Sequence, residues 1–229
     1  MPRPRALIAL FALLLVGLSA CTKNGSSTED LPAGATLIAE SAAAMQGVQS
    51  AHVRIDTEGE VSSLPMRRAE GDLLKSGDAK GSVLLSQFGA LIEYEFVVLG
   101  DSIYLKGVTG GWQQLPASVA STVYDPSAIL DPDRGIAKVL SSASDPTTEA
   151  KEQVDGKDAY RVKVALEGSA VSSLVPGVGN GITGTLWLDA TTKHLIKAVL
   201  SVPNTSGAKP GTVTISVSAI DVPVTVSAP

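Results

Sequence analysis

Cysteine is almost absent from this chain of 229 residues, which contains one, at position 21. A disulfide within the chain and a metal site built from several thiolates are therefore excluded. Histidine is nearly as scarce: His52 and His194 are the only two, and neither stands at metal-ligand spacing from a second ligand. We therefore expect no metal site and no cofactor.

Positive charge is also in short supply. The chain has 18 Lys and Arg residues against 23 Asp and Glu residues, which gives a net charge of −5. Binding to phosphate backbones requires clustered Lys and Arg, so we expect no nucleic-acid partner. Anionic headgroups repel an acidic surface, so membrane contact is expected to come from acyl chains on the protein rather than from charge.

Sequence motifs for catalysis are missing as well. The chain has no G-x-S-x-G segment and no P-loop. Residues 179–184 fit G-x-G-x-x-G, but a phosphate-binding loop needs a helix after it, and a strand is expected here. We expect no catalytic residues and a protein that is not an enzyme.

The N-terminus has the pattern of a secretory signal peptide. Arg3 and Arg5 precede an apolar stretch at residues 6–18, which is too short to span a bilayer comfortably. Cys21 follows Leu18-Ser19-Ala20, a spacing that resembles the lipobox of bacterial lipoproteins. We expect cleavage before Cys21 and lipid attachment to its thiol, since two acyl chains are sufficient for stable anchoring. The alternative is a secreted protein with an incidental cysteine.

Three regions are expected along the chain. Residues 1–20 would be the lipoprotein signal peptide. Residues 21–34 contain hardly any apolar side chains after Cys21, so they are expected to form a flexible tether. Residues 35–229 would form a single domain, because this length suits one domain and no interdomain linker is evident.

Within that domain, alternation of apolar and polar residues predicts about ten strands. An Asp155-Gly156 hairpin turn is expected because a type I′ turn needs positive φ at both central residues. Helices are expected from Thr36, as N-cap, to Met45, over two short segments that begin at the Asp-Pro pairs of residues 124–140, and over 169–175. The strands are expected at 52–58, 68–75, 81–88, 91–99, 102–106, around 112, and at 148–154, 157–166, 184–189, 194–202 and 212–219.

The short connections favour an antiparallel meander, and the few helices cannot cover a whole face of the sheet. The sheet therefore either folds into a dry sandwich or encloses a cavity. Periodicity does not separate these two possibilities, because core residues and cavity-lining residues have the same pattern.

Residues 124–140 read Y-D-P-S-x-I-L-D-P-D-x-G-I-A-x-V-L. Together with the lipobox, this segment resembles the LppX/LprG (LppX_LprAFG) family of actinobacterial lipoproteins, most closely its LprG-like members. Other matching features follow in the same order, among them Trp112 and the segment at 185–187, while Ile220 stands where the family is expected to have tryptophan. The resemblance covers essentially the whole chain after the signal peptide.

This resemblance implies an α+β fold: a strongly curved antiparallel sheet, or half-barrel, with a few helices on its concave face enclosing an apolar cavity. It also implies binding of acylated lipids, namely phosphatidylinositol mannosides, lipoglycans, triacylglycerol or phthiocerol dimycocerosates. The expected cavity lining, each member of which could instead belong to a dry core, comprises Val53, Ile55, Val83, Leu85, Ile92, Tyr94, Phe96, Val98, Leu130, Ile136, Val139 and Leu140.

The function implied is that of a carrier anchored to the cell membrane through acylated Cys21, which faces the periplasm and moves lipid towards the outer envelope. A family-like role would also imply an inner-membrane efflux transporter as partner, and we expect a monomer. The first alternative is a surface interaction or sensory lipoprotein with a dry core and no lipid cargo. A hydrolase is the second.

Overall fold

The computed structural model describes residues 31–59, 61, 65–116, 118, 126–175, 178–203 and 209–229. The expected signal peptide, Cys21 and most of the expected tether lie outside these residues. Residues 31–229 form one compact unit.

Eleven strands form a single sheet, in agreement with the alternating segments of the sequence. Their bounds are β1 Ser50–Glu58, β2 Met66–Leu74, β3 Ala79–Gln87, β4 Ala90–Leu99, β5 Ser102–Lys106, β6 Gln113–Pro116, β7 Ser144–Val154, β8 Lys157–Leu166, β9 Ile182–Asp189, β10 Leu195–Val202 and β11 Gly211–Ser218. The β7–β8 turn is the expected one, because φ is 50° at Asp155 and 79° at Gly156.

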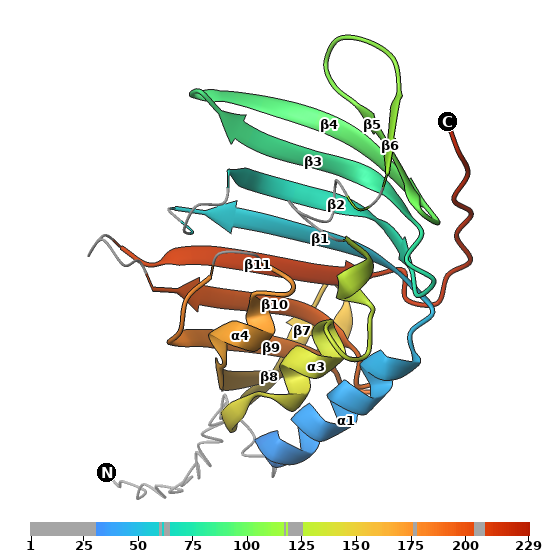
Figure 1. Cartoon of the computed structure of the whole chain (residues 1–229). Helices are drawn as coiled ribbons and strands as arrows, with labels where there is room; N and C mark the ends of the chain where they lie inside the picture. The colour runs from blue at the N-terminus through green and yellow to red at the C-terminus, as the bar shows by residue number, and fades with distance from the viewer. Residues whose placement is uncertain are drawn as a thin grey trace, which may run out of the picture. The chain divides into compact units, whose positions relative to one another are not determined.

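The sheet is antiparallel throughout, and the first and last strands pair at its centre. The strand order is β6-β5-β4-β3-β2-β1-β11-β10-β9-β8-β7 (Figure 1). Val53 faces Val217 and Ile55 faces Ile215 across the β1–β11 pair. One half-sheet, β1–β6, therefore comes from the first part of the chain, and the other, β7–β11, comes from the second part.

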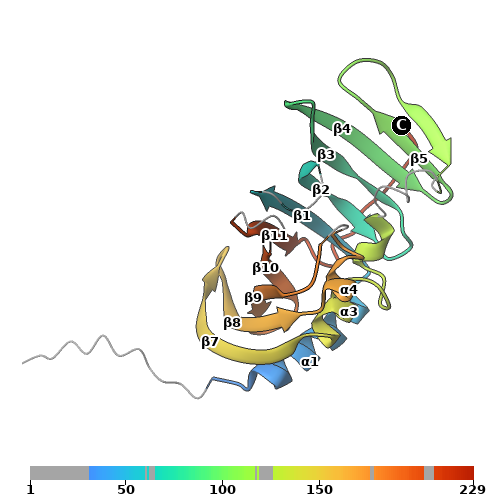
Figure 2. The same ribbon diagram turned by 60° about the vertical axis from the view of Figure 1, so that its left-hand side comes forward.

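In the part of the chain that the structure describes, four helical elements lie on the concave side of the curved sheet, mostly over the β7–β11 half (Figure 2). They are α1 Gly34–Gly47, the 3₁₀ helix η1 Pro126–Ile129, α3 Ile136–Ser141 and α4 Gly168–Val171. The α+β fold expected from the sequence, a curved antiparallel sheet with helices on its concave face, is confirmed.

Two expected helix caps are different in the structure. Helix α1 begins at Gly34, with Ala33 as N-cap and no side-chain cap, so Thr36 lies inside the first turn. A Cβ on Gly34 would clash with the backbone of Pro146 in β7, and this close approach fixes the helix start. Asp131 caps the turn before α3 rather than the helix, since its carboxylate accepts hydrogen bonds from the backbone N–H groups of Asp133 and Arg134 at 2.8 and 3.1 Å.

The best-covered part of the core lies between the helices and the β7–β11 half-sheet. Leu37 and Leu140 from the helices and Val162, Leu188 and Val213 from the strands are each at most 1% exposed. Burial of one such side chain stabilises the fold by about 1.5–3 kcal/mol. Inner-face residues of β3 to β6 are mostly only half-buried, so this half-sheet has room beneath it.

The C-terminal segment after β11 is attached to the start of β1. Asp221 accepts a hydrogen bond from the backbone N–H of Gln49 at 2.7 Å, and the Ser50 hydroxyl donates to the carbonyl of Val222 at 2.7 Å. Lys80 of β3 donates to the carbonyl of Thr225 at 3.1 Å. The tail after β11 therefore contacts the start of β1 and, further along, β3.

Candidate functional site

An apolar pocket of about 430 Å³ lies against the inner face of the β1–β6 half-sheet. Its volume falls within the range of about 300–1,000 Å³ that is typical of small-molecule sites. The pocket is lined by Val53, Ile55, Pro65, Met66, Ala69, Glu70, Gly71, Leu73, Val83, Leu85, Gln87, Tyr94, Phe96, Ile103, Leu105, Leu115, Pro126 and Ile129.

Strand register explains why these residues gather. Side chains alternate between the two faces of a strand, so residues paired across neighbouring strands share a face. One such row crosses four strands, running Ile55, Ala69, Val83, Tyr94. The pairing of every second residue in β1–β5 therefore produces a continuous apolar floor.

A second row contains two glycines, Gly71 and Gly81, which face each other across β2 and β3. A Cβ at Gly71 would clash with the carbonyl oxygen of Lys80, and a Cβ at Gly81 with that of Glu70. At this pair the two strands approach so closely that only residues without a Cβ fit. The missing side chains also leave space above the apolar floor.

The 3₁₀ helix η1 covers part of this floor through Pro126 and Ile129. Few polar side chains line the pocket. Gln87 ends β3 at one end of the pocket, and Tyr94 is a half-buried lining residue. Glu70 lines the pocket, but its carboxylate binds Arg54 at 3.4 Å, on the face opposite to that of its neighbours Ala69 and Gly71. No charge is therefore directed at the apolar floor by the lining residues.

Charged side chains occupy the convex face behind the pocket. Asp56 accepts hydrogen bonds from the Nε groups of Arg54 at 2.7 Å and Arg68 at 2.9 Å. The hydrogen bond from Arg54, and after it that from Arg68, hold the pKa of Asp56 below its ordinary value despite partial burial. This polar ladder keeps the outer face of β1 and β2 in water and leaves the inner face apolar.

The structure brings six of the twelve expected lining residues together in this pocket: Val53, Ile55, Val83, Leu85, Tyr94 and Phe96. Two more, Ile92 and Val98, lie on β4 at the same face but outside the pocket lining. The four expected on the helical segment do not line it. Leu130, Ile136, Val139 and Leu140 are buried in the hydrophobic core instead, and α3, which carries the last three, packs against α1 and α4.

Several lining residues were not expected from the sequence. Ala69 and Leu73 of β2, and Ile103 and Leu105 of β5, follow the same alternation as the residues that were expected, so the pattern did contain a signal for them. Leu115 of β6 lies in a four-residue strand without clear alternation. Pro126 and Ile129 reach the pocket only because η1 folds back over the sheet.

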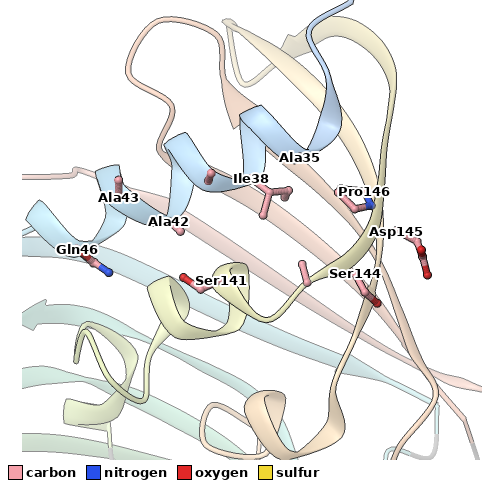
Figure 3. Close-up of a pocket in the computed structure, with 11 residues that line it drawn as sticks. Ala35, Ile38, Ala42, Ala43, Gln46, Ser141, Ser144, Asp145 and Pro146 are labelled. Atoms are coloured by element: carbon pink, nitrogen blue, oxygen red, sulfur yellow. The ribbon is translucent and has the colours of Figure 1, made fainter.

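A second hollow, of about 570 Å³, lies between α1, α3 and the start of β7 (Figure 3). Alanines form much of its lining, at positions 35, 39, 42, 43 and 143, and Gln46, Ser141 and Asp145 contribute polar groups. The alanine side chains are short and the edge of this hollow is polar, so the hollow offers a ligand little apolar contact. This groove is therefore a poorer match for an apolar ligand than the pocket over β1–β6.

Metal-binding clusters are not found among the described residues. None of these residues form a group of three or more His, Cys, Asp or Glu side chains that could hold a metal ion. His52 bonds to Asp72 at 2.8 Å on the convex face, away from the pocket. Nor, in the part of the chain that the structure describes, is any helix long and apolar enough to cross a membrane.

Comparison with known proteins agrees with this architecture. The family model for the LppX_LprAFG lipoproteins matches residues 33–226, nearly all of the folded unit. The chain belongs to the LppX_LprAFG lipoprotein family. Among relatives in the family, the lipoarabinomannan carrier protein LprG of Mycolicibacterium smegmatis is 35% identical over 207 residues, which cover 86% of this chain and 88% of that protein.

Two solved structures of LppX_LprAFG proteins have the same fold. LprF from Mycobacterium bovis superposes with a TM-score of 0.74 and 26% identity, covering 85% of this chain and 95% of that one. LppX from Mycobacterium tuberculosis superposes with a TM-score of 0.61 and 24% identity, covering 84% and 99%. The second likeness concerns the fold alone.

Proposed function

We propose that this protein is a lipid carrier that holds the acyl chains of an acylated glycolipid or triacylglycerol in the pocket over β1–β6. The observation that carries the proposal is the apolar pocket of about 430 Å³, lined by alternate residues of six strands and by η1. The name of the Mycolicibacterium smegmatis relative, a lipoarabinomannan carrier, supports the same class of cargo.

The proposed mechanism rests on the cost of hydrating acyl chains. Exposing one chain of about sixteen carbons to water costs on the order of 12 kcal/mol, at about 0.8 kcal/mol per methylene. The pocket shields the chains, while the polar headgroup remains in water at the mouth. Transfer then requires only a donor, an acceptor and a difference in affinity, so the carrier needs no covalent catalysis.

The rest of the proposal concerns placement in the cell. Residues 1–20 direct export, acylated Cys21 anchors the protein to the cell membrane, and residues 21–34 tether a single domain of residues 35–229. The carrier acts in the periplasm as a monomer, receives its lipid with the help of an inner-membrane efflux transporter, and delivers it towards the outer envelope.

Mass spectrometry of bound lipid tests the cargo. The chain from Thr22 to Pro229 is expressed in a mycobacterial host, purified without detergent and extracted with organic solvent. We expect close to one acylated glycolipid or triacylglycerol per protein. Val83→Trp fills the pocket from the middle of its floor, and we expect this variant to lose the lipid because the acyl chains no longer fit.

Leu84→Trp is the matched control, because Leu84 is the next residue in β3 and is not part of the pocket lining. It should fold and retain its lipid. Circular dichroism establishes that both variants are folded. Lipid-free extracts from the unmodified chain, under conditions in which a known carrier keeps its cargo, would refute the proposal and favour a lipoprotein with a dry core.

A further inference from the structure

Large apolar side chains are concentrated at one end of the sheet. Among the described residues, five are substantially exposed: Phe88, Leu91, Val108, Trp112 and Val222. Phe88 and Leu91 are at the β3–β4 turn, and Val108 and Trp112 are in the β5–β6 loop. Because the strands are antiparallel, both connections point towards the same end of the half-sheet, and the β4–β5 turn lies at the other end. The β5–β6 loop leaves the sheet level with Glu95, midway along β4.

The same end adjoins the pocket. Gln87, the last residue of β3, is a lining residue, and the fully exposed Phe88 follows it directly. Val222 lies after β11, whose C-terminal end pairs with the start of β1, so it is at the opposite end. We call Phe88, Leu91, Val108 and Trp112 the apolar rim.

Charge is absent from both connections that carry the apolar rim. Residues 85–92 and 107–116 contain no Asp, Glu, Lys or Arg, although 18% of the chain is charged. Entry of a charged side chain into the boundary of a bilayer is costly, whereas exposed Phe, Leu and Trp bind there through their apolar area. The apolar rim therefore has the composition of a bilayer contact within an otherwise acidic protein.

Trp112 adds an amphipathic element. The Nζ of Lys106 lies 5.7 Å from the centre of its ring, and the same ammonium binds Glu95 at 3.2 Å. Tryptophan prefers the level of lipid headgroups, and lysine can extend its charge from an apolar surface into water. Glu95 lies between the lining residues Tyr94 and Phe96 in β4 and so points to the convex face, where this pair marks the depth at which water would begin.

From these observations we infer that the apolar rim inserts into the outer boundary of a lipid bilayer, so that the pocket opens directly onto the membrane from which its cargo is taken or to which it is delivered. This inference rests on the proposed carrier function. It adds a membrane contact separate from Cys21 and gives the acyl chains a path that avoids water.

The two tryptophans of the chain, Trp112 and Trp187, allow a direct test. The full lipidated chain is reconstituted into vesicles of phosphatidylcholine and phosphatidylglycerol, with or without bromine on the acyl chains. Trp187→Phe leaves Trp112 as the reporter, and we expect bromine to reduce its emission by about half or more, because the ring lies at the headgroup level. Trp112→Phe leaves Trp187, on β9 in the other half-sheet, which should keep nearly all of its emission.

Further variants distinguish insertion of the apolar rim from nonspecific adsorption of the protein to vesicles. Phe88→Ser with Leu91→Ser, added to the Trp112 reporter, should remove most of the quenching, whereas Val222→Ser should leave it unchanged. Equal quenching of both tryptophans, or of neither, would overturn the inference. Absence of quenching with a dimer in sedimentation would assign the apolar rim to a second copy of the chain.

Extraction of the chain from Thr22 to Pro229, purified without detergent and before any contact with vesicles, distinguishes this inference from the function it rests on. Protein that carries lipid but leaves Trp112 unquenched refutes the membrane contact and leaves the carrier function in place. Protein whose Trp112 is quenched but whose pocket is empty after extraction refutes the carrier function, while the contact itself stands.

Discussion

Phe88 lowers the stability of the fold, whereas its exposure is informative about function. It has a φ of 51°, followed by 80° at Gly89, so the β3–β4 turn places both central residues in the left-handed region. Such turns favour Asn-Gly, and a side chain such as phenylalanine costs on the order of 1–2 kcal/mol there. Its ring is fully exposed and gains no packing in return.

Phe88→Asn should therefore stabilise the isolated protein by about 1 kcal/mol, because asparagine suits the turn better and no buried contact is lost. The midpoint of thermal unfolding, measured by circular dichroism, should rise by about 2–4 °C for a domain of this size. Leu91→Ser, which changes a neighbouring exposed residue without altering the turn, should leave the midpoint nearly unchanged. A lower midpoint for Phe88→Asn would mean that the ring is packed in solution.

At the scale of single elements, the facing glycines of β2 and β3 determine both shape and stability. Gly81→Ala should destabilise the protein by about 2 kcal/mol, because the added methyl group meets the backbone of Glu70 and the strands must separate. Urea unfolding measures the change. Gly47→Ala at the end of α1 is the control: apart from the chain neighbours and the backbone of α1 itself, no atom lies within 4 Å of the added Cβ, and we expect a gain of about 0.5–1 kcal/mol. Equal effects of the two substitutions would disprove the close approach of the strands.

The elements differ in how far they could be predicted. Strands such as β4 and β8 follow from strict alternation, and the β7–β8 turn follows from Asp155-Gly156. The start of α1 could not be predicted, because it depends on contact between Gly34 and Pro146, more than a hundred residues away. Alternation also identified which side of β1, β3 and β4 faces inward, but it carried no information on which inner residues a helix covers. Ile136 and Leu140 of α3 were expected in the pocket from the family resemblance, and they lie in the core because α3 packs against α1.

At the scale of the whole molecule, the central β1–β11 pair is the only strand pairing among the described residues that joins the two half-sheets. A chain that ends at Pro210 lacks β11 and leaves the edges of β1 and β10 unpaired, so we expect it to be insoluble or aggregated. A chain that ends at Pro223 keeps β11 and the hydrogen bonds of Asp221 and Val222, and we expect a soluble monomer. Size-exclusion chromatography of the two chains checks this. A monomeric, folded product from the shorter chain would show that the half-sheets are independent.

The central β1–β11 pair also determines when folding of the sheet can be completed. Ribosomes deliver the N-terminus first, so β1 to β6 are available early, while the partner for the free edge of β1 is the last strand to emerge. Contacts between residues so far apart in sequence form slowly, and an unpaired edge invites association with other chains. Folding of this protein is thus expected to finish only after β11 has emerged, and a chaperone that shields β1 until then would raise the yield of native protein.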